Sequence, residues 1–255
     1  MADNNLDTNL DNRARSHVGS TALSLEAFES MMQTGKTSTL ESEAHLTQKG
    51  LEIDTLNTSD NSRSSMIISG DAEIKSGFTS HYLSGQFSIE HHSGAGSFTE
   101  TAAYERGQNY YDIFRKAPYV TESLSINGAD GTSSNRYEPA QSRIKKVDGQ
   151  VQYDANQQPM RIADATSGTN CAPNFDYPGD NKTTCEFILH SKKFGDFSVN
   201  DTREVLPNGT FSSRQVWRNE EGKPIAIVEA NQKKDASGSM TSSWVKARRP
   251  LNYDK

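Results

Sequence analysis

The strongest constraint on the fold is an alternation of apolar and polar residues with a period of two. It is clearest at Met66, Ile68, Gly70, Ala72 and Ile74, where every second residue is small or apolar. Successive side chains of a β-strand point to opposite faces, so this pattern predicts a strand with one buried face. The same period recurs through the first half of the chain, in segments spaced by roughly 8 to 12 residues, which is typical of an antiparallel meander.

Composition agrees with a sheet that is buried on one face only. Hydrophobic residues make up 33% of the 255 residues, too few for a parallel sheet buried on both faces. The net charge is only -6, so self-repulsion is weak and the low apolar content does not by itself imply disorder. We predict a mainly β (α+β) fold: an antiparallel β-meander, as an open curved sheet or half-barrel, with one N-terminal helix packed on it. Strand order and barrel closure stay open.

Turn signals separate the expected strands. Lys49-Gly50 and Asn208-Gly209 are typical of tight turns or bulges. Trp217 and Trp244 fall on C-terminal strands, where we expect core positions, although either ring could border a pocket. The strands beside these turns, and a last pair near the C-terminus, are expected at residues 40–46, 51–53, 194–206, 210–218, 224–232 and 239–248.

One short amphipathic helix precedes the strands. Ser24 suits an N-cap, and Leu25, Phe28 and Met32 share one face at helical spacing. Gly35 is expected to end the helix as the residue after its C-cap. Because the helix is short, it must lie across an apolar surface to be stable.

The domain organisation follows from these patterns. Residues 1–19 lack apolar periodicity, so we expect a disordered N-terminal tail that can be removed without loss of stability. Residues 20–250 are expected to form a single β-rich domain with its helix at 24–34, and residues 251–255 a C-terminal tail.

The two cysteines bear on the compartment. Cys171 and Cys185 flank a loop rich in Pro, Gly, Asp and Asn, and a disulfide across about 15 residues would contribute roughly 3 kcal/mol. We predict that this disulfide forms, with free thiols as the alternative. A disulfide implies an oxidising location, here the periplasm, the cell surface or the medium. Residues 1–20 contain no signal-peptide h-region, so this location requires a signal or lipid tether that has been removed.

Several function classes lack support. The chain has no dense basic stretch, which argues against nucleic acid as a partner. No window holds the roughly 18 apolar residues of a transmembrane helix. Gly35-Lys36-Thr37 and Gly94-Ala95-Gly96 are fragments of phosphate-binding and dinucleotide-binding loops in the wrong context, so we predict no cofactor.

Histidines and nucleophiles give no clear site. His91 and His92 are adjacent on an expected strand and should point to opposite faces, so at most one of them could share a site with His81. His45 and His190 have no convincing partner in the sequence. We therefore predict no metal site, and with no nucleophile motif we predict no enzymatic activity.

The most informative segment for binding is Tyr104 to Val120, where aromatic and basic residues alternate. Tyrosine offers a large contact area at low entropic cost, so part of this segment can form a binding surface. A small aromatic core is the alternative. The candidate binding residues are Tyr110, Tyr111, Phe114, Arg115 and Tyr119.

These observations favour a non-catalytic, exported binding protein of the bacterial envelope type, periplasmic, surface-attached or secreted. It would recognise a macromolecule or ligand through a sheet face or loops. A helix followed by a long meander also resembles the layout of periplasmic lipoprotein carriers, which implies a half-barrel carrier of a lipid, acyl chain or other hydrophobic ligand as an alternative. An enzyme with dispersed catalytic residues is the second alternative.

Overall fold

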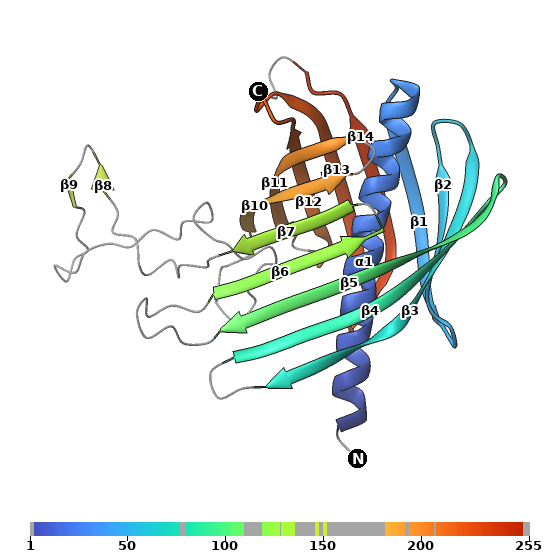
Figure 1. Ribbon diagram of the computed structural model, residues 1–255, viewed down its shortest axis with the longest axis vertical. Helices are drawn as coiled ribbons and strands as arrows, with labels where there is room; N and C mark the ends of the chain where they lie inside the picture. Colours follow the sequence, from blue (N-terminus) through green and yellow to red (C-terminus); the bar gives the residue numbers. More distant parts are fainter. Residues whose placement is uncertain are drawn as a thin grey trace.

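The computed structural model describes residues 3–76, 80–109, 119–127, 129–135, 146–147, 150–151, 182–191, 194–206 and 208–251. A long helix, α1 (Asp3–Thr34), is followed by antiparallel strands (Figure 1). The strands of the main sheet are β1 (Ser38–Thr47), β2 (Gly50–Asn57), β3 (Ser62–Ser76), β4 (Ser80–Ser93), β5 (Gly96–Asn109), β6 (Tyr119–Ile126), β7 (Ala129–Asn135), β10 (Lys182–Ser191), β11 (Gly195–Val205), β12 (Phe211–Arg218), β13 (Pro224–Lys234) and β14 (Met240–Arg248). A separate pair is formed by β8 (Lys146–Val147) and β9 (Gln150–Val151).

The main sheet is a meander in which nearly every strand pairs with its neighbours in sequence. The exception is β10, which pairs with β7 through the short stretch from Ile188 to Ser191. On the other side of the molecule, β1 pairs with both β2 and β14, so the order of hydrogen-bonded strands is cyclic. The predicted class, mainly β with an antiparallel meander and one N-terminal helix packed on it, is confirmed. The cyclic order adds what the sequence left open.

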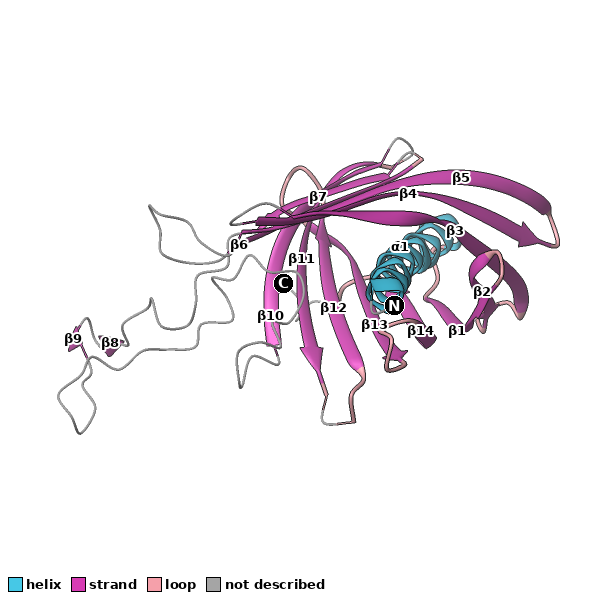
Figure 2. Ribbon diagram, turned by 90° about the horizontal axis from the view of Figure 1, so that it is seen from below, coloured by secondary structure: helices cyan, strands magenta, loops and turns pink. Residues whose placement is uncertain are grey.

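The helix lies inside the curve of the sheet (Figure 2) and contacts chiefly β14, β3 and β1. Its side chains Val18, Leu23, Phe28 and Met31 are buried against the inner face of the sheet. The inward residues of the strands are mostly apolar and alternate with mostly polar outward ones, as the period of two predicts. The inward set includes Leu40, Leu51, Ile53, Met66, Ile68, Val245 and Ala247.

The expectation of a disordered tail over residues 1–19 is wrong, because the helix begins at Asp3 instead of near Ser24. The additional turns escaped the sequence analysis because their buried face is small and polar. Asn12 and Ser16 are buried polar residues, and the apolar residues buried beside them, Ala14 and Val18, are small and give only a weak apolar signal. Removing this segment should therefore destabilise the fold.

Polar residues in the first half of α1 bind the backbone of the sheet. The pairing of β2 with β3 ends at Ile68, so the edge of β3 beyond that point has no neighbouring strand. Arg15 donates to the Gly70 carbonyl from Nε at 2.9 Å and from Nη2 at 2.7 Å. Asp11 accepts a hydrogen bond from the backbone N–H of Ala72 at 2.7 Å. The helix thus satisfies backbone groups that a strand would otherwise pair.

The ends of several elements agree with the sequence. Gly35 follows the helix with φ +70° and its N–H donates to the Met31 carbonyl, as expected for a residue after a C-cap. The Asn208-Gly209 hairpin and the last strand pair lie where they were predicted. The first hairpin differs slightly, because Thr47 pairs with Gly50 and the turn falls one residue earlier than expected.

Candidate functional site

A groove of about 980 Å³ runs along the outer face of the sheet, across β13, β14, β1, β2 and β3. It extends from Asn208 in the β11–β12 turn to Arg63 at the start of β3. The outer face is defined by the alternation of the strands: Trp244 is 37% exposed, whereas its neighbours Ser243 and Val245 are buried against the interior. Most of the lining residues are outward in this sense, so the groove lies mainly on the side of the sheet opposite α1, with the inward Ser42, Thr55 and Ser243 also at its border.

Trp244 is the large aromatic residue of this groove. The strand register places it opposite Glu41 of β1 and Asn231 of β13. When the Asn231 amide is oriented to satisfy both of its ends, its oxygen accepts a hydrogen bond from the indole Nε1 of Trp244 at 3.1 Å. Its nitrogen then donates to Ser212 at 3.1 Å. The polar edge of the ring is thus bound to the sheet, while part of its surface stays open to solvent.

Acidic side chains share the groove with the exposed indole. Glu41, Glu43 and Asp54 line the groove together with the basic residues Arg63 and Lys233. Glu43 and Asp54 are directly opposite each other across β1 and β2. Within the described part of the chain, neither of these two carboxylates has an ion-paired partner. Two opposed like charges are unfavourable, so this part of the groove attracts cations.

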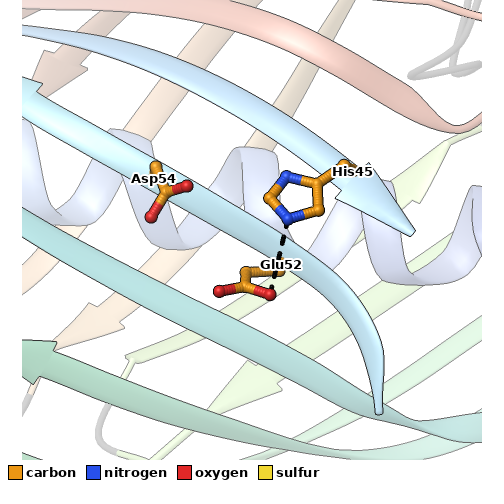
Figure 3. A group of neighbouring side chains, drawn as sticks. All are labelled: His45, Glu52 and Asp54. Atoms are coloured by element: carbon orange, nitrogen blue, oxygen red, sulfur yellow. Dashed lines mark ion pairs between the residues drawn. The ribbon is translucent and has the colours of Figure 1, made fainter. Parts of the chain in front are cut away.

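A histidine and two carboxylates form a cluster that adjoins the groove (Figure 3). His45 on β1 is opposite Glu52 on β2, and the His45 Nε2 and Glu52 Oε2 atoms are 3.5 Å apart. Asp54 lies two residues further along β2 on the same face, and one ligand atom from each residue lies within 4.8 Å of the others. The sequence analysis found no partner for His45, because a partner across a hairpin is identified only by the register.

The adjacent histidines His91 and His92 do not belong to this cluster and contact other residues. His91 Nε2 lies 2.9 Å from Glu100 Oε2, and the His91 ring stacks on Phe98 at 4.4 Å between ring centroids. His92 Nε2 lies 3.9 Å from a carboxylate oxygen of Glu90. The side chain of His81 is outside the described set. His91 therefore takes part in an ion pair and a ring stack between strands.

Two interior acids are bound within the fold. Asp201 is fully buried and accepts hydrogen bonds from Arg203 at 2.7 Å, Ser213 at 2.8 Å and Gln215 at 3.3 Å. Glu26 of α1 accepts a hydrogen bond from Ser64 of β3 at 3.2 Å, and burial raises the pKa of Glu26. The network of Asp201 leaves that carboxylate no exposed surface for a ligand.

The residues predicted for binding are not tested by the structure. Tyr110, Tyr111, Phe114 and Arg115 lie outside the described residues, and for Tyr119 only the backbone, at the start of β6, is described. Their role in binding stays a prediction.

The predicted disulfide is likewise untested. Cys171 lies outside the described residues, and Cys185 is a residue of β10 whose register partner is Asp201. A Cys171–Cys185 disulfide therefore stays a prediction.

Sequence reasoning missed most of the groove. It placed Trp244 on a strand and named a pocket border as one alternative to the core, and the structure places this residue in the groove. Glu41, Glu43 and Asp54 were not singled out. On β1 the two glutamates alternate with Leu40, Ser42 and Ala44, and on β2 Asp54 lies between Ile53 and Thr55. This alternation was the sequence signal that could have assigned the three acids to the outer face.

Comparisons with known proteins identify no relative of this chain. No protein-family model, no curated protein and no solved structure matches this chain. In the described part of the chain, no helix is long and apolar enough to cross a membrane. Inference about function therefore rests on the geometry of the groove and of the neighbouring cluster.

Proposed function

We propose that the protein is a non-catalytic binding protein that takes a lysine- or arginine-bearing segment of another protein in the outer groove. The observation that supports this most directly is an exposed indole, Trp244, in one groove with three carboxylates, of which Glu41 is its cross-strand neighbour. An aromatic face attracts a cation, and carboxylates beside it add a charge-assisted contact.

The strand register would let one cationic side chain contact both the indole of Trp244 and a carboxylate of β1. Glu41 is the direct cross-strand neighbour of Trp244, and Glu43 is the next outward residue along β1. A cationic side chain over the indole would therefore meet carboxylates from the adjacent strand. Tryptophan is among the residues that most often supply the energy of a protein interface, and here it is already held by Asn231. A preorganised ring loses little entropy on binding.

The lining of the groove favours binding over catalysis. Its described residues include neither histidine nor cysteine, so a Ser–His or Cys–His nucleophile pair is not among them. They offer hydroxyl, amide and charged groups in addition to the indole. A binding role requires nothing beyond the groups that line the groove.

The carrier alternative receives less support. A half-barrel carrier needs an open apolar interior, but Leu23, Phe28 and Met31 of α1 fill the space beside the inner faces of the neighbouring strands. An exported location, in the periplasm, at the cell surface or in the medium, is part of the proposal. It depends on the predicted Cys171–Cys185 disulfide.

The test is a titration with a short oligolysine peptide, followed by calorimetry and by tryptophan fluorescence. Of the two tryptophans, Trp217 is 2% exposed, so a change in emission on binding reports on Trp244. We expect saturable binding that weakens as salt is added, because the contact is electrostatic and partly exposed. Trp244→Phe and Glu41→Gln should each weaken the peptide affinity several-fold or more.

Glu105→Gln is the matched control, because Glu105 is an exposed acid on β5 that does not line the groove. This variant should bind the peptide like the parent. Equal affinity in Glu41→Gln and the parent would contradict the proposal. Binding of a neutral oligosaccharide in place of the peptide would also contradict it, because the carboxylates would then have no role as countercharges.

A further inference from the structure

We propose that His45, Glu52 and Asp54 form a binding site for a divalent transition-metal ion of the zinc class on the outer face of the β1–β2 hairpin. The three side chains come from two paired strands and project from one face (Figure 3). This inference does not depend on peptide binding in the groove, although Asp54 also lines the groove.

The distances suit a shared ion. Zinc binds histidine nitrogen and carboxylate oxygen at about 2.0–2.2 Å, so two ligand atoms on one tetrahedral ion are roughly 3.4 Å apart. His45 Nε2 and Glu52 Oε2 are 3.5 Å apart, and one ligand atom from each of His45, Glu52 and Asp54 lies within 4.8 Å of the other two. The side chain of Asp54 is exposed, so packing does not fix its orientation.

The strand register supplies a second observation. Glu43 is the direct neighbour of Asp54 across the two strands, and in the described part of the chain no cationic side chain is paired with either of them. Two carboxylates directly opposite each other are destabilising in a sheet. A divalent cation at Asp54 would offset this repulsion, so the charge pattern and the ligand geometry independently indicate a cation at the same place.

The donor set indicates the class of metal. An imidazole nitrogen with two carboxylate oxygens suits zinc and its neighbours in the first transition series. Magnesium and calcium prefer an all-oxygen set, so an imidazole ligand disfavours both. The three protein ligands leave at least one coordination position for water or for a ligand, since zinc sites are usually four-coordinate. The register also explains why the site is confined to this hairpin: His45 faces Glu52, and the next outward residue of β2 is a second acid.

The experiment is a calorimetric titration of the full, tag-free chain with Zn²⁺, repeated with Co²⁺ to follow its absorption spectrum and with Mg²⁺ as a competitor. We expect one equivalent of Zn²⁺ to bind and a large excess of Mg²⁺ to leave it in place. His45→Ala, Glu52→Gln and Asp54→Asn should each weaken the Zn²⁺ affinity tenfold or more. These residues are exposed or half-buried, so circular dichroism of the variants should match that of the parent.

His92→Ala is the matched control. His92 is an exposed histidine beside one carboxylate, that of Glu90, and belongs to no group of three ligands in the described chain. Its loss should change the affinity by less than twofold. The proposal is overturned if His45→Ala keeps the affinity of the parent, or if His92→Ala weakens binding as much as His45→Ala does. Trp244→Phe should leave Zn²⁺ binding unchanged, which separates this site from the peptide-binding proposal.

Discussion

The two faces of the same strands carry different parts of the protein's chemistry. On β1, Leu40 points inward to the helix and is 1% exposed, whereas its neighbour Glu41 points outward into the groove. On β14, Val245 and Trp244 divide in the same way. A sheet buried on one side can therefore use one set of residues for stability and the alternate set for binding, with little interference between them.

The two faces also differ in how they accommodate acidic side chains. The inner face tolerates Asp201 only because Arg203, Ser213 and Gln215 satisfy its oxygens. The outer face leaves Glu43 and Asp54 opposite each other in contact with solvent. A buried charge must be paired within the fold because its desolvation is costly. An exposed charge stays hydrated without a partner and can bind a ligand later.

The largest effect is expected for an inner-face ring. Phe28 is 1% exposed and packs on Trp217 at 4.4 Å between ring centroids, with Phe194 and Phe197 at its edges. Phe28→Ala should lower the free energy of unfolding by about 3–5 kcal/mol. Urea unfolding checks this, with Gln33→Ala on the exposed end of the helix as the control. A variant as stable as its parent would show that α1 does not pack in the sheet as described.

A smaller effect is expected for the buried carboxylate. Asp201→Asn keeps the shape of the side chain but removes the charge that Arg203 faces at 2.7 Å. Hydrogen bonds to charged groups contribute about 1.5–3 kcal/mol each, and Arg203 is partly exposed, so a loss toward the lower end of this range is expected. The loss is measured by urea unfolding. An unchanged midpoint would mean that the Asp201 network does not stabilise the inner face.

The smallest effect on stability depends on pH. Burial raises the pKa of Glu26 above its ordinary value of 4.5, against the opposing effects of the Ser64 hydrogen bond and of His91. Between the ordinary and the raised pKa, the folded chain holds a proton that the unfolded chain has released. Stability should therefore fall as the pH rises through that window and stay lower above it.

Glu26→Gln tests this sign. The variant has no proton to lose at this position, so it should match the parent near pH 4 and be the more stable of the two at neutral pH. Unfolding free energies at several pH values measure the difference. Glu220→Gln, in the exposed turn before β13, should follow the parent throughout. If Glu26→Gln is the less stable variant at neutral pH, the direction of the shift is wrong.

The sequence predicted the inner face far better than the outer one. An alternation such as that of Met66 and Ile68, which are both buried, indicates which face of a strand is inward, and alternation of this kind predicted the meander. The first half of α1 was missed because its buried face holds the polar Asn12 and Ser16 and the small Ala14, which leave only a weak apolar period.

The outer site could not be derived because it depends on register. The turn was expected at Lys49-Gly50, whereas Thr47 pairs with Gly50. With the observed register, His45 faces Glu52 and Glu43 faces Asp54. A shift of one residue changes every cross-strand pair, so neither the acidic pair nor the histidine cluster was visible in the sequence.

The most direct test of the division between the faces compares two neighbours on β1. Leu40→Ala should lower the free energy of unfolding by about 2–5 kcal/mol and leave the oligolysine affinity of the folded fraction unchanged. Glu41→Gln should change stability by less than about 0.5 kcal/mol and weaken the peptide affinity several-fold. Urea unfolding and calorimetric titration of both variants measure these four quantities. If Leu40→Ala weakens binding by the folded fraction, or if Glu41→Gln binds the peptide like the parent, the inner and outer faces do not have separate roles.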